Sequence, residues 1–284
     1  MKIISPELSE YEFLQKYIEP VEYSCVQLAS FIRKQDEHIF AVIKTQSISS
    51  EKDIIGVFFL NRVLVHSVSG FFNLTESQQN ELKQLLNDFF ADKTIKCIDG
   101  EAEGSDFFYS ILKNSKALLQ ENVYSLMTLT ETPLLPPESL SLDAEIRRCT
   151  EDDFDLLFET QKMYIAKEVA PQGKSVSEAE VSITLRQILK NQLCFALFSD
   201  GDLVAKANTN AIGWKWVQLG GIFTHPLYRR NYYAWNLVVT ICNRVIKRGR
   251  NLCLFVKEKN IPARKLYSRI GFKDSGIFKI IYLN

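Results

Sequence analysis

Residues 217–236 read VQLGGIFTHPLYRRNYYAWN, and this stretch decides the fold. An apolar, strand-like run ends at His225, and an amphipathic helix begins a few residues later. The first backbone N–H groups of such a helix have no partner within it, and the helix dipole adds positive potential there. Arg229 and Arg230 lie in the connecting loop, where guanidinium groups match phosphate oxygens. The stretch therefore predicts a strand–loop–helix unit that holds phosphates.

The rest of the second half continues the alternation of strands and helices. Asp200-Gly201 is a strong hairpin signal, and Gly220-Gly221 predicts a bulge or a close backbone approach. Helices are expected after Thr150, after Ser177, from Trp235 and after Asn260. The expected strands cover residues 193–199, 202–211, 215–223, 252–256 and 276–283, the last of which should close the sheet of this half.

The first half shows the same order of elements. Helical runs flank Pro20, and a capped helix follows Thr75. Strands are expected over residues 38–45, 54–60, 63–68, 95–98 and 123–130, with a helix over 106–113. Prolines gather in the segment that follows, which indicates a linker. We therefore predict an N-terminal α/β domain (1–130), a linker (131–144) and a C-terminal domain (145–284).

Composition limits the classes of function. Residues 1–140 carry 12 Lys and Arg against 20 Asp and Glu, whereas residues 141–284 carry 22 against 14. A basic half indicates an anionic partner, either coenzyme A or nucleic acid. Six cysteines without a C-x-x-C pair predict reduced, buried thiols and no metal site. No apolar run approaches the ~20 residues that span a bilayer, and no signal-peptide core is present, so we expect a soluble cytoplasmic protein without membrane contact.

Two motifs of the second half resemble the GCN5-related N-acetyltransferase (GNAT) superfamily. The loop pattern of that family is Arg/Gln-x-x-Gly-x-Gly/Ala, and Arg229 fits its first position and Ala234 its last. Tyr232 stands where the family has glycine, which lets loop backbone approach a pyrophosphate. The second motif, Asn-x-x-Ala-x-x-Leu-Tyr-x-x-x-Gly-Phe, is complete in NIPARKLYSRIGF from Asn260 to Phe272. If Tyr232 adopts a positive φ it is strained, although Asn231 tolerates that conformation and offers an alternative turn.

The resemblance implies a fold and a chemistry. The fold is of the α/β (α+β) class, with a mixed, mostly antiparallel central sheet flanked by helices, and the GNAT-like arrangement is expected in tandem. The first half is then either a degenerate copy or an unrelated α/β domain. The implied activity is transfer of an acetyl group from acetyl-CoA to a primary amine, as in acyltransferases, without a metal.

The resemblance also assigns site residues. The pantetheine arm of acetyl-CoA would pair with a splayed strand, and the diphosphate would lie on the loop. Tyr267 would be the general acid for the leaving thiolate, or else a helix tyrosine that packs under the sheet. Asn260 would reach the coenzyme or serve as a turn residue. Glu168 and His225 are candidate general bases. A solvated loop carboxylate is the favoured interpretation of Glu168, and a turn residue that of His225. The coenzyme-binding set is Ile222, Phe223, Thr224, Arg229, Arg230, Asn231, Tyr232, Tyr233, Ala234 and Asn260.

Two other functions stay open. The altered loop is compatible with a protein that has lost catalysis and binds acyl-CoA or a protein partner. The basic C-terminal face is compatible with an RNA-associated transferase, but the sequence holds no RNA-binding motif, so nucleic acid is disfavoured. The amine acceptor is not identifiable from the sequence.

Overall fold

The computed structural model describes residues 1–138, 140, 143–170 and 175–284, and it forms two compact units. Unit 1 comprises Met1–Leu126 together with Ser275–Asn284, and unit 2 comprises Met127–Asp274. Each unit has its own hydrophobic core.

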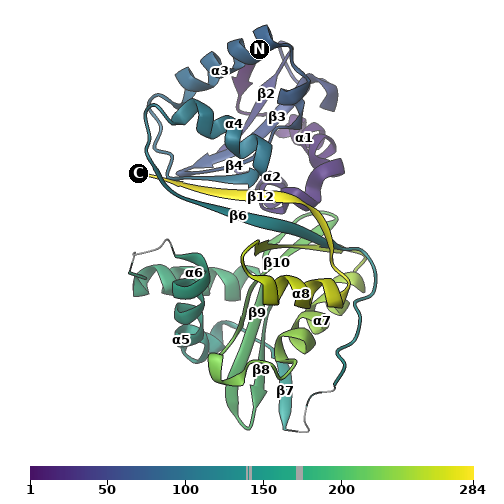
Figure 1. Cartoon of the computed structure of the whole chain (residues 1–284). Helices are drawn as coiled ribbons and strands as arrows, with labels where there is room; N and C mark the ends of the chain where they lie inside the picture. The colour runs from purple at the N-terminus through teal and green to yellow at the C-terminus, as the bar shows by residue number, and fades with distance from the viewer. Residues whose placement is uncertain (139, 141–142, 171–174) are drawn as a thin grey trace. The chain divides into compact units, whose positions relative to one another are not determined.

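The sheet of unit 1 follows the order β1-β2-β3-β4-β5-β12-β6 (Figure 1). The pairs β1–β2, β2–β3, β3–β4 and β5–β12 are antiparallel, and β4–β5 is parallel. Its strands are β1 (Lys2–Ile4), β2 (Ile39–Ile43), β3 (Ile54–Asn61), β4 (Val63–Ser67), β5 (Cys97–Glu101), β6 (Leu118–Leu129) and β12 (Lys273–Leu283).

The helices of unit 1 are α1 (Tyr11–Ile18), α2 (Val26–Arg33), α3 (Glu76–Phe90) and α4 (Ala102–Leu112). Thr75 caps α3 as expected, because its side chain accepts a hydrogen bond from the Gln78 N–H while the Gln78 side chain accepts from the Thr75 N–H. The core is rich in aromatic rings, and Phe58, Phe71 and Phe108 are fully buried in it.

The sheet of unit 2 has the same plan. From the edge inward its order is β7-β8-β9-β10-β11-β6. The pairs β7–β8, β8–β9 and β9–β10 are antiparallel, and β10–β11 is parallel. The strands are β7 (Ala144–Arg148), β8 (Cys194–Ser199), β9 (Asp202–Ile212), β10 (Trp216–Thr224) and β11 (Asn251–Lys257). The short edge strand β7 begins at Ala144, the last residue of the segment expected to be a linker.

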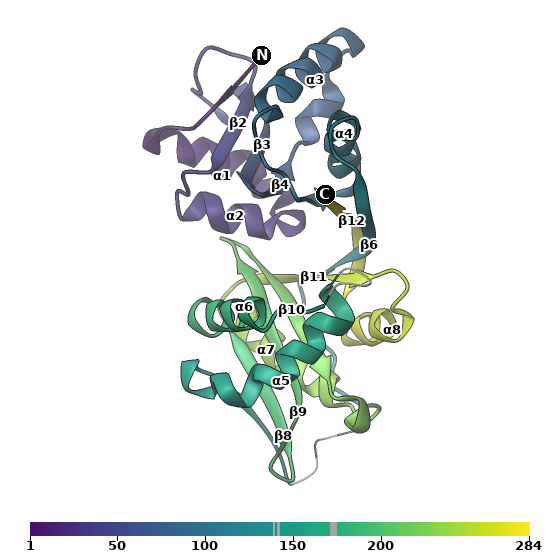
Figure 2. The same ribbon diagram turned by 90° about the vertical axis from the view of Figure 1, so that its left-hand side faces the viewer.

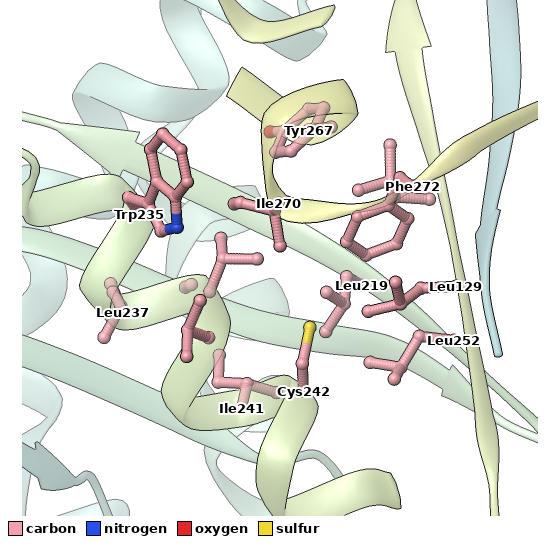
Figure 3. Packing of buried hydrophobic residues seen from close by; sticks show 14 of the residues in the cluster. Leu129, Leu219, Trp235, Leu237, Ile241, Cys242, Leu252, Tyr267, Ile270 and Phe272 are labelled. Atoms are coloured by element: carbon pink, nitrogen blue, oxygen red, sulfur yellow. The ribbon is translucent and has the colours of Figure 1, made fainter. Parts of the chain in front are cut away.

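The helices of unit 2 are α5 (Phe154–Tyr164), α6 (Glu178–Asn191), α7 (Tyr233–Ile246) and α8 (Ile261–Ile270). In Figure 2, α5 and α6 lie in front of the strands of this sheet and α7 lies behind them. A five-residue π-helical turn, Ile165–Val169, continues α5. The largest cluster of apolar side chains lies between the sheet, α7 and α8, and it includes Trp235, Ile241, Cys242 and Tyr267 (Figure 3).

The final strand corrects one expectation. The sequence suggested that residues 276–283 close the sheet of the second half, but Ser275–Asn284 belong to unit 1. There β12 pairs with β5, from Phe278↔Glu101 to Tyr282↔Cys97, and Ile281 and Leu283 are buried in the core of unit 1. In return, β6 ends in unit 2, where Met127 and Leu129 join the core. The division at residues 130 and 145 stays a prediction about separately folding domains.

The expectation of reduced, buried thiols is met. All six cysteines are free and buried. Within the described ranges, no helix is both long and apolar enough to cross a membrane, and no cluster of three or more His, Cys, Asp or Glu could hold a metal ion.

Candidate functional site

The two parallel strands at the centre of unit 2 separate partway along their length. The β10–β11 register runs from Trp216↔Asn251 to Leu219↔Leu254 and stops there, although β10 continues to Thr224. A strand that leaves its neighbour presents backbone N–H and C=O groups at an open edge. This edge is where the sequence placed the pantetheine contacts.

A bulge lies at the point of separation, as the double glycine predicted. The β9–β10 register shifts between Gly220 and Phe223, so Gly221 and Ile222 of β10 oppose the single residue Ala207 of β9. Gly221 has φ +58°, and a Cβ there would be 1.8 Å from Asn208 Oδ1. Only glycine fits this position without a shift of its surroundings.

Of the three residues expected to contact pantetheine, the bulge presents two by their backbone. Phe223 pairs with Lys206, and the His225 N–H donates to the Val204 carbonyl at 2.9 Å. Backbone polar groups alternate sides along an extended strand, so those of Ile222 and Thr224 point away from β9. The Phe223 backbone faces β9 instead. Its side chain is buried and packs edge-on against the Tyr164 ring, with 6.4 Å between the two ring centroids.

The loop after β10 is shaped as an anion-binding turn. Arg230 and Tyr232 both have positive φ, +67° and +54°, so Tyr232 rather than Asn231 takes the left-handed turn. Tyr232 is the N-cap of α7, and its side chain makes no cap hydrogen bond. Among the residues that the structure describes, no protein group accepts a hydrogen bond from the backbone N–H groups between Arg230 and Trp235. These donors are therefore available to a ligand.

The side chains of this loop point in different directions. Arg229 and Arg230 are exposed, and the described part of the chain places no carboxylate within ion-pair distance of either. The Arg229 Nε donates to the Thr224 carbonyl at 3.3 Å, which holds the guanidinium beside the end of β10. The Tyr232 ring packs on the core, 6.3 Å from the Trp235 ring centroid. Its left-handed backbone stores roughly 1–3 kcal/mol of strain.

Three further predicted residues are already engaged within the fold. The Tyr233 hydroxyl donates to Ser199 Oγ at 3.2 Å, and the Asn231 side chain donates to the Tyr228 carbonyl at 3.4 Å. Asn260 caps α8, because its Oδ1 accepts from the Ala263 N–H at 3.3 Å. The turn role considered for Asn260 is thus present, and its amide nitrogen is left to reach a ligand. Ala234 lies in the first turn of α7 and is half-buried.

Tyr267 lies on α8 against Phe272, and it is 7% exposed. Burial raises the pKa of its hydroxyl, and the nearby Tyr164 and Glu168 raise that pKa further. The hydroxyl therefore stays protonated at neutral pH, and it lies close to groups on α5 and its π-helical turn. Figure 3 shows the ring at the margin of the apolar cluster.

Sequence reasoning missed three residues beside this site. Tyr164 accepts a hydrogen bond from the Gly221 N–H, and burial raises the pKa of Tyr164 to about 12. Gln161, one turn earlier on α5, is 1% exposed, and its Oε1 has no hydrogen-bond partner among the described residues. Lys206, on β9, is fully buried and donates to the Gly221 carbonyl. A lysine inside an apolar strand was the one available signal.

The equivalent position in unit 1 is closed. The β4–β5 register also stops early, at Val65↔Asp99. The next residue, His66, is fully buried, and its ring lies where a Cβ on Gly100 or Gly104 would be, 2.3 or 2.5 Å away. His66 Nε2 lies 3.0 Å from Ser105 Oγ, and Thr75 satisfies the start of α3. Unit 1 thus lacks both the open strand edge and the uncapped helix.

Comparisons with known proteins agree with this picture. A family model described as FR47-like protein, which is GNAT-like, matches residues 199–278, a range that contains the loop and α8. A Drosophila protein of known structure is similar to the whole chain, at 13% identity and a TM-score of 0.68, covering 99% of this chain and 98% of its own. No curated protein matches the sequence.

Two further solved structures share this fold with the chain. An acetyltransferase of the GNAT family from Colwellia psychrerythraea has 14% identity and a TM-score of 0.58, covering 100% of this chain and 99% of its own. A GCN5-related N-acetyltransferase from Kribbella flavida has 13% identity and a TM-score of 0.53, covering 91% and 92%. The resemblance read from the two motifs is confirmed, the chain has a GNAT-like fold, and the match over both units fits a tandem arrangement. Identities this low establish the fold and not the activity.

Proposed function

We propose that unit 2 is an acetyl-CoA-dependent N-acetyltransferase that acts on a primary amine. The observation that carries the proposal is the uncapped start of α7, whose free N–H groups adjoin two exposed arginines and an open strand edge. Phosphates bind such helix ends, and pantetheine amides pair with free strand edges. The coarse class agrees with the GNAT-like fold.

The coenzyme would lie along the loop and the open edge. The N–H groups of Arg230 to Ala234 and the Arg229 and Arg230 guanidinium groups bind the diphosphate. The backbone groups of Ile222 and Thr224 pair with the pantetheine arm, and Phe223 anchors the strand between them. Asn260, at the start of α8, contacts the arm from the opposite side.

The chemical step would be direct transfer. The neutral amine attacks the thioester carbonyl, whose developing negative charge the Ile222 N–H stabilises. The carbon–sulfur bond then breaks, and the Tyr267 hydroxyl gives its proton to the leaving thiolate. Glu168, whose charge raises the pKa of Tyr267, would accept the proton that the nitrogen loses. The unpartnered Oε1 of Gln161, on the same face of α5 as Tyr164, offers an acceptor for an N–H of the amine.

Titration calorimetry with acetyl-CoA, followed by a thiol-release assay over a panel of amines, tests the proposal. The variant R229Q/R230Q should lose at least tenfold in affinity. The matched control K247Q/R248Q removes the same charge at exposed positions at the far end of α7 and should bind like the wild type. No binding by the wild type at millimolar acetyl-CoA would overturn the proposal, and so would equal losses in the two double variants.

A second function has a specific observation in its favour. Tyr232 holds a strained left-handed turn at the glycine position of the loop, and Tyr267 is almost fully buried. Both features suit a protein that binds acyl-CoA without turning it over. Coenzyme binding with no thiol release on any amine would favour that function over catalysis.

A further inference from the structure

Lys206 is a buried cation in the interior of unit 2. It lies on β9, is 1% exposed, and has no carboxylate within ion-pair distance among the described residues. Its Nζ donates to the Gly221 carbonyl at 3.0 Å and to Asn208 Oδ1 at 3.1 Å, and it lies 4.9 Å from the centre of the Tyr164 ring. Burying an unpaired ammonium is unfavourable, so these three contacts must recover its lost hydration. Consistent with that penalty, burial lowers the pKa of Lys206 to about 8.

The contacts of Lys206 and Tyr164 converge on one residue of the bulge, Gly221. Gly221 lies where the β9–β10 register shifts, so the regular ladder does not bind it. The Lys206 ammonium donates a hydrogen bond to the Gly221 carbonyl, and the Tyr164 hydroxyl oxygen accepts one from the Gly221 N–H. Asn208, which holds the ammonium, lies against the Gly221 Cα so closely that no side chain fits there. Both polar groups of this residue are therefore fixed by side chains from β9 and α5.

The next residue along the strand is Ile222, whose backbone groups face the open edge. The direction in which its N–H points depends on the orientation of the preceding peptide plane, which contains the Gly221 carbonyl. If that carbonyl rotated, the Ile222 N–H would rotate with it, because the two belong to one rigid planar unit. The Lys206 ammonium is thus coupled directly to the donor that faces the splayed edge.

We propose that Lys206 is a positioning residue, which clamps the Gly221–Ile222 peptide so that its N–H is presented at the open edge of β10. Its role toward acetyl-CoA rests on the proposed function, and the clamp itself does not. Tyr164 holds the preceding peptide, Gly220–Gly221, through the Gly221 N–H, and is the second jaw of this clamp. Lys206 touches neither coenzyme nor amine in this scheme.

The first arm of the test needs no ligand. Backbone hydrogen exchange is compared in the wild type, in K206M, and in K190M, a matched substitution of an exposed lysine at the end of α6. K206M should exchange at least tenfold faster at Gly221 and Phe223, whose N–H groups face Tyr164 and β9, with α7 unchanged, and K190M should behave as the wild type. Y164F, which removes the second jaw, should accelerate exchange at Gly221. Unchanged exchange in K206M would overturn the clamp.

The second arm compares two ligands. Acetyl-CoA reaches the bulge, whereas adenosine 3′,5′-bisphosphate is too short to do so and reports on the loop side alone. K206M should bind acetyl-CoA at least tenfold more weakly and the bisphosphate equally well. Equal loss for both ligands, or for neither, would overturn the positioning role. If the wild type binds neither ligand, the proposed function fails while the exchange arm still decides the clamp. Should K206M not fold, K206Q, which removes the charge and shortens the side chain by one atom, is judged by the same criteria.

Discussion

Two glycines of unit 2 share a left-handed backbone but differ in their surroundings, and alanine at each should separate strain from collision. Gly201, in the β8–β9 hairpin, has φ +84° with no atom within 4 Å of a built Cβ. Gly221 has φ +58°, and its Cβ would lie 1.8 Å from Asn208 Oδ1. Gly201→Ala should therefore lower the free energy of unfolding by about 1 kcal/mol, the cost of a left-handed backbone for a residue with a Cβ. Gly221→Ala should lose that amount plus about 1–3 kcal/mol for overpacking.

The assay follows tryptophan fluorescence during thermal unfolding, because all three tryptophans, Trp214, Trp216 and Trp235, lie in unit 2. A unit of this size shifts its midpoint by about 2–4 °C per kcal/mol, so the two variants should differ by at least several degrees. G221A should cost less in an N208A background than in the wild type, since the colliding oxygen is absent there. Equal midpoints for the two single variants would refute the packing argument for the bulge.

The other predictions concern catalysis, folding and pH. Tyr267→Phe should lower turnover by about 10²–10⁴-fold with acetyl-CoA affinity unchanged, as steady-state kinetics and calorimetry would show, and full turnover would remove Tyr267 from the mechanism. Deleting residues 275–284 removes Ile281 and Leu283 from the core of unit 1 and should speed hydrogen exchange in α3 and α4, whereas exchange confined to β5 would contradict a shared core. Burial lowers the pKa of His66 to about 3, so the unfolded chain takes up its proton first as pH falls below about 6.5. Below about pH 6.5, the free energy of unfolding of the wild type should then fall by roughly 1.4 kcal/mol per pH unit, and that of H66Q should fall less. Urea unfolding at pH 7 and pH 5 measures both, and equal pH slopes would contradict the prediction.

The sequence predicted the parts of the fold that depend on local pattern. The strand before His225, the loop arginines and the helix from Trp235 follow from periodicity and from the two motifs, and the bulge follows from Gly220-Gly221. The loop conformation was harder, because Asn231 has the better intrinsic tolerance for positive φ. Tyr232 takes that conformation instead, and packing of its ring on the core is the tertiary term that a local pattern does not contain.

Long-range features lay beyond the sequence. The apolar alternation of residues 276–283 shows that one face is buried, but it does not show which sheet receives the strand. Tyr164 and Lys206 are 42 positions apart in the chain and meet only at the bulge. His66 reads as an isolated histidine in an apolar strand until Gly100 and Gly104 are seen to leave room for its ring. The candidate loop was therefore predictable, whereas the side chains that support it were not.

The exchange of the last strand has a consequence for synthesis on the ribosome. Unit 1 contains the first 126 residues, yet its sheet is incomplete until β12 arrives, at the very end of the 284 residues. While unit 2 is being translated, the edge of β5 that pairs with β12 in the finished protein has no partner. A stalled or shortened chain would leave that edge exposed, so the N-terminal half can mature only after its C-terminal neighbour has been made.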